Sequence, residues 1–144
     1  MIDDDTHDRA GIHDLFSRYA DAVTGRQWEL FDEVFTEDVT SAGMGSPEIE
    51  GRAALVRRIR NAIERTSKTH LLGNYTATID GDVAEASVRV RVHQLWAGTS
   101  IRLHHKISGS FRVKLIRTRT GWRFRHFGPA RYTKSVAQEL FAPT

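Results

Sequence analysis

Three side chains in this sequence can move or hold a proton in a setting that suits catalysis: Tyr19, His70 and His93. A neutral imidazole titrates near physiological pH, so a histidine can remove a proton next to a carbonyl group or a leaving group. A buried phenol needs a hydrogen-bond partner, and a substrate oxygen can be that partner. The structural alternative is a histidine bonded within a strand pair and a tyrosine bonded to a backbone carbonyl.

Metal and thiol chemistry are not indicated. The sequence contains no Cys, so it can form no disulfide, thiolate metal site or cysteine nucleophile. His104 and His105 are neighbours in a predicted strand, so they point to opposite faces and cannot share one metal ion. No helical H-x-x-x-H pattern or neighbouring carboxylate pair completes a ligand set, and we predict no metal site.

The elements that must position these residues follow from the apolar spacing. A first helix, which Gly25 ends, is predicted from the helically spaced residues Ile12, Leu15, Phe16, Tyr19, Ala20 and Val23. A short second helix is predicted over residues 28–35 and a third from Arg52 to about Thr66. From Lys68 the apolar period changes to two, which is typical of strands.

The dipeptide Asp80-Gly81 between two strand patterns predicts a two-residue hairpin turn. That turn would place His70 opposite Arg91, with His93 one diagonal step away on the same face. The valines of the second strand would then lie on the other face. Three readings of this arrangement stay open: a partly polar pocket, a bulge in one strand, or a solvent-facing His93.

Two further strands are predicted over residues 101–117 and 121–132, and the last residues are expected to form a short amphipathic cover with Val136, Leu140 and Phe141. Helices followed by strands predict an α+β fold, with a cone-shaped, antiparallel or mixed sheet curved around the N-terminal helices. Such a curved sheet leaves a cavity suited to a small ligand. The length predicts a single domain over residues 1–144.

Charge is unevenly distributed along the chain. Residues 102–134 contain ten Lys or Arg and no Asp or Glu. These cations alternate with apolar residues, as on the solvated face of a sheet, and no nucleic-acid-binding motif accompanies them, so no nucleic-acid partner is expected. No apolar run approaches the roughly 20 residues of a bilayer span, and the acidic N-terminus is unlike a signal peptide, which predicts a cytoplasmic protein without a membrane partner.

Six short motifs, taken in order, resemble the SnoaL-like family of the nuclear-transport-factor-2-like superfamily. They are RYADAV, LFDEVFTEDV, EGRAAL, HLLGN, DGDVA and GWRF, and the resemblance extends from about Asp8 to Tyr132. It implies a conical pocket, a small and mostly apolar ligand, and no cofactor. It also implies a homodimer or homotrimer.

The resemblance also implies roles for individual residues. Tyr19 would bond a substrate oxygen, His70 would be the general base, and His93 would be a second pocket histidine. Further candidates for substrate binding are Thr24, Asn74, Trp96, Arg112 and His126. Thr24 stands where the dehydratases of the family carry an Asp that charges the histidine, and a hydroxyl brings no negative charge.

We therefore expect a cofactor-independent lyase, isomerase or cyclase that acts by acid-base proton transfer on a hydrophobic, oxygenated, cyclic or polyketide-like metabolite. The missing Asp keeps a second hypothesis open, in which the pocket only folds a reactive substrate into a near-attack geometry. A third hypothesis is a non-catalytic small-molecule-binding protein, because one fold serves many functions.

Overall fold

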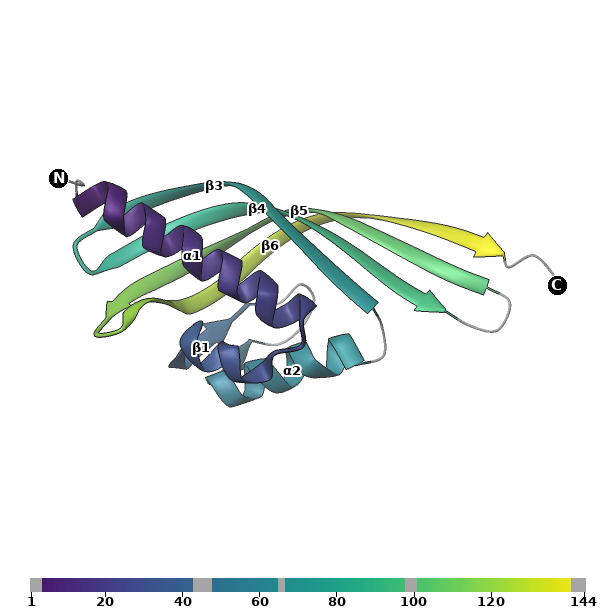
Figure 1. The fold of residues 1–144 in the computed structure, drawn as a ribbon, viewed down its shortest axis with the longest axis horizontal. Coiled ribbons are helices and arrows are strands. Elements are labelled where there is room, and N and C mark those ends of the chain that lie inside the picture. Colours follow the sequence, from purple (N-terminus) through teal and green to yellow (C-terminus); the bar gives the residue numbers. More distant parts are fainter. Residues whose placement is uncertain (1–3, 43–47, 65–66, 98–100, 141–144) are drawn as a thin grey trace.

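Six strands form one sheet in the order β2-β1-β6-β5-β4-β3, and α1 lies across one face of that sheet (Figure 1). The computed structural model describes residues 4–42, 48–64, 67–97 and 101–140. Within these ranges, the side chains of residues 4, 62–64, 67–72, 74, 92, 94–97, 101–105, 107 and 129–140 are outside the description. The helices are α1 (Asp4–Thr24), the 3-10 helix η1 (Trp28–Glu33) and α2 (Arg52–Glu64). The strands are β1 (Phe35–Ser41), β2 (Ile49–Glu50), β3 (Ser67–Asp80), β4 (Val83–Ala97), β5 (Ile101–Thr118) and β6 (Gly121–Leu140).

The predicted α+β class is confirmed, and the sheet is mixed. Strands β3 to β6 pair antiparallel, whereas β1 pairs parallel with β6. The strands continue past the end of α1, so the helix covers only part of their length (Figure 1). None of the described helices has the length and apolar character that crossing a membrane requires.

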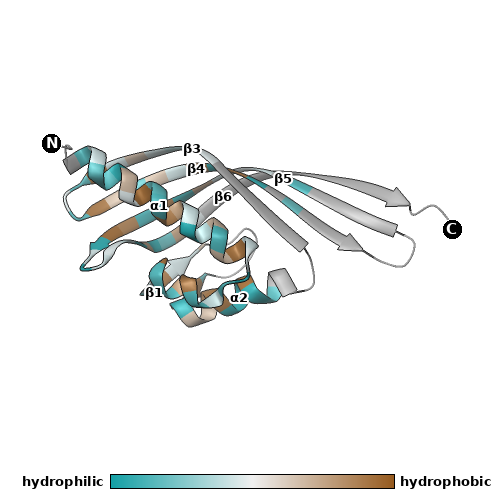
Figure 2. Cartoon of the chain, viewed as in Figure 1, coloured by the Kyte–Doolittle hydropathy of each residue, from teal (hydrophilic) through white to brown (hydrophobic). Residues whose placement is uncertain are grey.

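The helix α1 forms because its apolar residues recur on one side. Ile12, Leu15, Phe16 and Val23 are all at most 3% exposed and pack in the core. Polar residues take the intervening positions, and the alternation is visible along α1 and the strands it covers (Figure 2). The predicted first and third helices are confirmed, and α2 likewise buries Leu55 while it exposes Arg57, Arg58 and Arg60.

The two faces of the sheet differ in the same way. The inner face, which α1 covers, carries the buried residues Ala84, Ala86, Val88, Val90, Phe111, Val113, Leu115 and Phe124. The outer face carries exposed residues at the alternate positions, including Glu85, Arg89, Arg91, Arg112 and Lys114. The basic stretch of the sequence therefore supplies much of an exposed sheet face, as predicted.

The predicted pairing of His70 with Arg91 is wrong. The hairpin closes one residue later than expected, because Asp80 pairs with Val83 and leaves Gly81 as the first of two turn residues. Gly81 has a φ of 61°, which a type II′ hairpin turn requires at that position. The register then shifts between Gly73 and Thr76, and beyond this irregularity His70 pairs with Val92.

The predicted amphipathic cover at the C-terminus is also wrong over the described residues. Strand β6 continues to Leu140, which pairs with Ile101 of β5. The longer ladder has a simple physical reason, since it pairs the backbone groups of residues 101–110 that would otherwise need other partners. Phe141 lies outside the described residues.

An ion-pair network ties the start of α1 to two hairpin turns. Arg117 donates to both carboxylate oxygens of Asp8, with Nη2 at 2.9 Å from Oδ2, and its Nε lies 3.1 Å from Oδ1 of Asp82. Its guanidinium also stacks 4.6 Å from the ring centre of Trp122. The hydrogen bonds from Arg117 lower the pKa of Asp8, against the opposing effect of burial. The network fixes where α1 begins on the sheet.

Asp8→Asn is expected to destabilise the fold by about 1–3 kcal/mol, because it removes a bidentate, nearly buried acceptor. The folded-state pKa of Asp8 is depressed, so this stabilisation is present above the unfolded pKa and is lost as pH falls through the folded value. Urea unfolding at pH 7 and pH 3 measures both effects. Asp38→Asn is the control, because the Asp38 and Arg125 pair is exposed and 3.6 Å apart. If Asp8→Asn and Asp38→Asn lose the same free energy of unfolding at pH 7, the Asp8 and Arg117 pair does not stabilise the fold more than an exposed pair does.

Candidate functional site

Tyr19 lies in the core, 6% exposed, inside a group of five phenylalanine rings. We call this group the aromatic layer: Phe31, Phe35, Phe111, Phe124 and Phe127. The ring centre of Tyr19 lies 5.2 Å from that of Phe127 and 6.1 Å from that of Phe111. The phenol therefore sits in surroundings of low polarity, where a hydrogen bond to its hydroxyl is stronger than in water.

The histidine that sequence analysis favours as a base belongs to the inner face by its register. His70 pairs with Val92, and two residues further Leu72 pairs with Val90. Val90 is 2% exposed and lies on the inner face. Because residues two apart in a strand share a face, His70 occupies an inner-face position, opposite the layer that contains α1. Its side chain is outside the described set.

The helix α1 runs antiparallel to β3. Near its start, Arg9 donates from Nη1 to the carbonyl of Ala77 at 2.8 Å. Two turns later, the ring of Phe16 lies 5.7 Å from that of Tyr75. Later residues of α1 therefore meet earlier residues of β3.

This direction places the end of α1 near His70. From Phe16 to Thr24 the helix rises roughly 12 Å. The same length of strand is roughly four residues, so a point level with Thr24 falls close to Leu71. Tyr19 lies between these two levels. His70 on β3 and Tyr19 on α1 thus belong to the two layers that face each other, at similar positions along the helix and strand.

The predicted sharing of one face by His70 and His93 is wrong. His93 pairs with Thr69, so it falls on the face opposite to His70, and its side chain is exposed. The register shift in β3 is the cause, because a slip of one residue moves every following side chain to the other face. Of the alternatives that the sequence left open, a strand irregularity and an exposed His93 both occur.

Two other candidates also lie on the outer face. Arg112 is exposed between two buried neighbours in β5. His126 pairs with the exposed Lys114 and lies half-buried, with its Nδ1 2.6 Å from Oγ1 of Thr40. This geometry separates both residues from Tyr19.

Thr24 is the last residue of α1 and is exposed. The side chains of Asn74, Trp96, His104 and His105 lie outside the described residues. Within the described part of the chain, no group of three His, Asp or Glu residues is placed to hold a metal ion.

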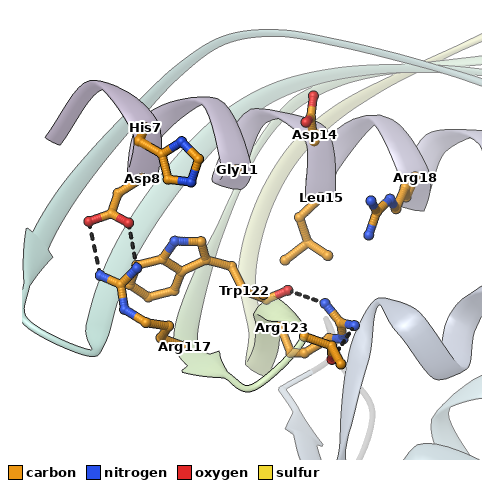
Figure 3. Close-up of a pocket in the computed structure, with 11 residues that line it drawn as sticks. His7, Asp8, Gly11, Asp14, Leu15, Arg18, Arg117, Trp122 and Arg123 are labelled. Atoms are coloured by element: carbon orange, nitrogen blue, oxygen red, sulfur yellow. Dashed lines mark hydrogen bonds and ion pairs between the residues drawn. The ribbon is translucent and has the colours of Figure 1, made fainter. Parts of the chain in front are cut away.

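Sequence analysis missed a polar pocket of about 160 Å³ between α1 and the β5–β6 turn (Figure 3). It is lined by His7, Asp8, Gly11, Asp14, Leu15, Arg18, Arg117, Thr120, Gly121, Trp122 and Arg123. These residues come from two segments about 100 positions apart in the sequence, so no local spacing could have revealed them. Only the GWRF motif marks one wall, and in the sequence it serves as one of the six motifs of the family resemblance.

A family model described as the SnoaL-like domain matches residues 4–128. The solved structure of the Kfla4162 protein from Kribbella flavida aligns at 25% identity with a TM-score of 0.79, over 94% of this chain and 95% of that chain. A nuclear-transport-factor-2-like protein with a cystatin-like fold from Novosphingobium aromaticivorans aligns at 26% identity and 0.68, over 88% of each chain. A hexachlorocyclohexane dehydrochlorinase aligns at 16% identity and 0.73, over 94% of this chain and 90% of that one, which shows a shared fold.

Proposed function

The chain belongs to the SnoaL-like family, and from this premise we propose that it is a cofactor-independent enzyme that moves a proton on a small, hydrophobic, oxygenated metabolite. The reaction class is a lyase, isomerase or cyclase step. The observation that carries the proposal is the register of β3, which gives His70 an inner-face position opposite the layer that holds Tyr19. The likeness to a dehydrochlorinase, an enzyme whose name describes an elimination, supports the same class.

The proposed step needs only side chains of this protein. The imidazole of His70 takes a proton from the carbon next to a carbonyl group, and the electron pair moves onto the carbonyl oxygen. Tyr19 donates its hydroxyl proton in a hydrogen bond to that oxygen as it becomes enolate-like. The aromatic layer strengthens this bond by keeping water away. Return of the proton at another position, or loss of a leaving group, completes the reaction.

Tyr19→Phe tests the proposal with little change in packing. Turnover of a panel of cyclic ketones and hydroxyketones is expected to fall about 10- to 100-fold, because one donor to the developing oxyanion is removed. The value of KM should change much less, since the bond strengthens mainly in the transition state. Steady-state kinetics measures both constants. A variant with wild-type kcat would remove Tyr19 from the mechanism.

A template cyclase is the second candidate, and one observation favours it. Thr24 brings no charge to the helix end that lies level with His70, at the position where the resemblance implies a carboxylate in the family's dehydratases. The conical pocket that the family resemblance implies would then act by holding reacting atoms in a near-attack geometry. A non-catalytic binder of the same ligand class is the third candidate and would show affinity without turnover.

Thr24→Asp separates acid-base chemistry from template chemistry. A carboxylate near His70 would stabilise the imidazolium, so the inflection in the profile of kcat against pH should move to higher pH. The wild-type profile should itself have an inflection, because the base must lose its proton before it can act. Thr24→Asn is the matched control without charge. Flat profiles for all three proteins would favour the template.

We also propose that the chain assembles as a homodimer or homotrimer through the outer face of its sheet. This face carries acids and bases side by side and an exposed apolar residue, Val83, which is 52% exposed. A second copy could pair these charges and cover Val83. Sedimentation equilibrium gives the number of copies.

A further inference from the structure

The polar pocket between α1 and the β5–β6 turn contains three arginines, and they differ in how their charge is balanced. Arg117 is neutralised within the network described above, by the carboxylates of Asp8 and Asp82. Its guanidinium is also fixed against Trp122. Arg117 therefore lines the pocket, but its positive charge is already balanced by two carboxylates and is not available to a ligand.

Arg123 forms no ion pair with a carboxylate in the part of the chain that the structure describes. Its residue is 9% exposed, and its guanidinium donates from Nη1 to the carbonyl of Trp122 at 2.8 Å and from Nη2 to Oγ1 of Thr120 at 2.9 Å. Both acceptors are neutral. Among the described residues, no carboxylate lies within ion-pair distance of it. A cation withdrawn from water without a counter-charge costs free energy, which a bound anion would recover.

A second cation faces the same space. Arg18 of α1 lines the pocket with Arg123 of β6, and Figure 3 shows the two guanidinium groups on the same side of Leu15. Burial lowers the pKa of Arg123, and the positive charge of Arg18 lowers it further, against a weaker opposing effect of Glu33. Asp14 also lines the pocket, yet within the described part of the structure it forms no ion pair with Arg18. Two positive charges thus line one pocket, and no described carboxylate forms an ion pair with either of them.

We propose that Arg18 and Arg123 form a binding site for a phosphate-sized oxyanion, either free or as the phosphate group of a small metabolite. Guanidinium groups match the oxygens of a phosphate, and five N–H donors on each leave enough for a ligand after the two bonds that Arg123 makes internally. The volume of about 160 Å³ holds a tetrahedral oxyanion with a few waters.

This site is independent of the proposed enzymatic reaction. Arg18 and Tyr19 are neighbours on α1, but Arg18 is exposed on the pocket side whereas Tyr19 points into the aromatic layer. The pocket lies along the first two thirds of α1, and His70 is level with its last residue. Occupancy of one site can therefore be measured without turnover at the other.

Isothermal titration with sodium phosphate, at constant ionic strength set with sodium chloride, tests the proposal. The full-length protein is expected to bind one phosphate per chain, with a Kd on the order of 1 mM. Arg18→Gln should weaken binding at least about fivefold, because one of the two cations is lost. Arg57→Gln is the matched control, since it removes one exposed positive charge from α2 and should leave the Kd unchanged. Glycerol 3-phosphate and acetate are titrated in parallel.

Tighter binding of glycerol 3-phosphate than of phosphate would assign the site to a phosphorylated metabolite, and equal binding would assign it to the free anion. Both results support the proposed site, provided that Arg18→Gln weakens the binding of the anion and Arg57→Gln does not. The proposal is overturned if no saturable binding occurs up to about 50 mM phosphate, or if Arg18→Gln binds as tightly as wild type. Melting temperatures with and without phosphate give a second measurement. If phosphate raises the melting temperature equally in wild type, Arg18→Gln and Arg57→Gln, the proposal is also overturned, because phosphate excluded from the surface stabilises proteins generally.

Discussion

His70→Ala is expected to lower kcat by about 10²- to 10⁴-fold, which is the usual contribution of a general base. The reason is the position of His70 on the inner face of β3, level with the end of α1 and close to the level of Tyr19. Affinity for the substrate should change little, since the proton transfer occurs only on the way to the transition state. Single-turnover kinetics on the best substrate of the panel separates the two effects.

His93→Ala is the matched control for this experiment. It removes an imidazole from the adjacent strand, at a position that is exposed on the outer face. Its kcat should stay within about twofold of wild type, as for a surface substitution away from the site. If His70→Ala keeps wild-type kcat while the fold melts normally, the assignment of the base fails and the template reading gains support. If His70→Ala and His93→Ala lose activity equally, the inner-face position of His70 does not explain its role.

Helix positions in this chain could be predicted because the burial pattern repeats every three to four residues. Ile12, Leu15, Phe16 and Val23 specify one side of α1, and the structure buries all four. The same spacing predicts that Tyr19 is buried. It cannot identify the five rings around Tyr19, because they come from η1, β1, β5 and β6, which meet only in the folded sheet.

Strand register was less predictable, and it decides the site. The sequence contains a clear turn signal, but Gly81 occupies the first turn position rather than the second, and the strand is irregular between Gly73 and Thr76. The turn moves each partner on β4 by two residues, and the irregularity moves it back by one, so His70 pairs with Val92 instead of Arg91. Since side chains alternate between faces, the resulting register decides which of His70 and His93 shares a face with the core.

The oxyanion pocket shows a different limit. Arg18 and Arg123 each look like ordinary surface cations within their own segments. Their significance depends on burial of Arg123 and on the lack of a carboxylate beside it among the described residues, which only the packing of α1 on β6 creates. Sequence spacing identifies faces of single elements, whereas a site built between elements needs the tertiary structure.

Gly128→Ala is expected to destabilise the fold by roughly 2–4 kcal/mol, the largest stability effect of a single methyl group that we predict here. Gly128 lies in β6 where this strand meets the end of β1, and its φ of 120° disfavours any residue with a Cβ. A Cβ at this position would also clash with the carbonyl oxygen of Ala42. Ala42 cannot move away freely, because its N–H donates to the carbonyl of Phe127 at 3.1 Å.

The loss should appear as a fall in melting temperature of roughly 10 °C for a domain of this size. Gly73→Ala is the matched control, because no described heavy atom lies within 4 Å of the added Cβ and the backbone there is not left-handed. That variant should melt within a few degrees of wild type. Equal melting temperatures for the two alanine variants would mean that β1 and β6 do not pack as closely as the structure has them. Because β6 also contributes Phe127 to the aromatic layer, Gly128→Ala should further loosen the contact between Phe127 and Tyr19 and lower turnover in parallel with stability.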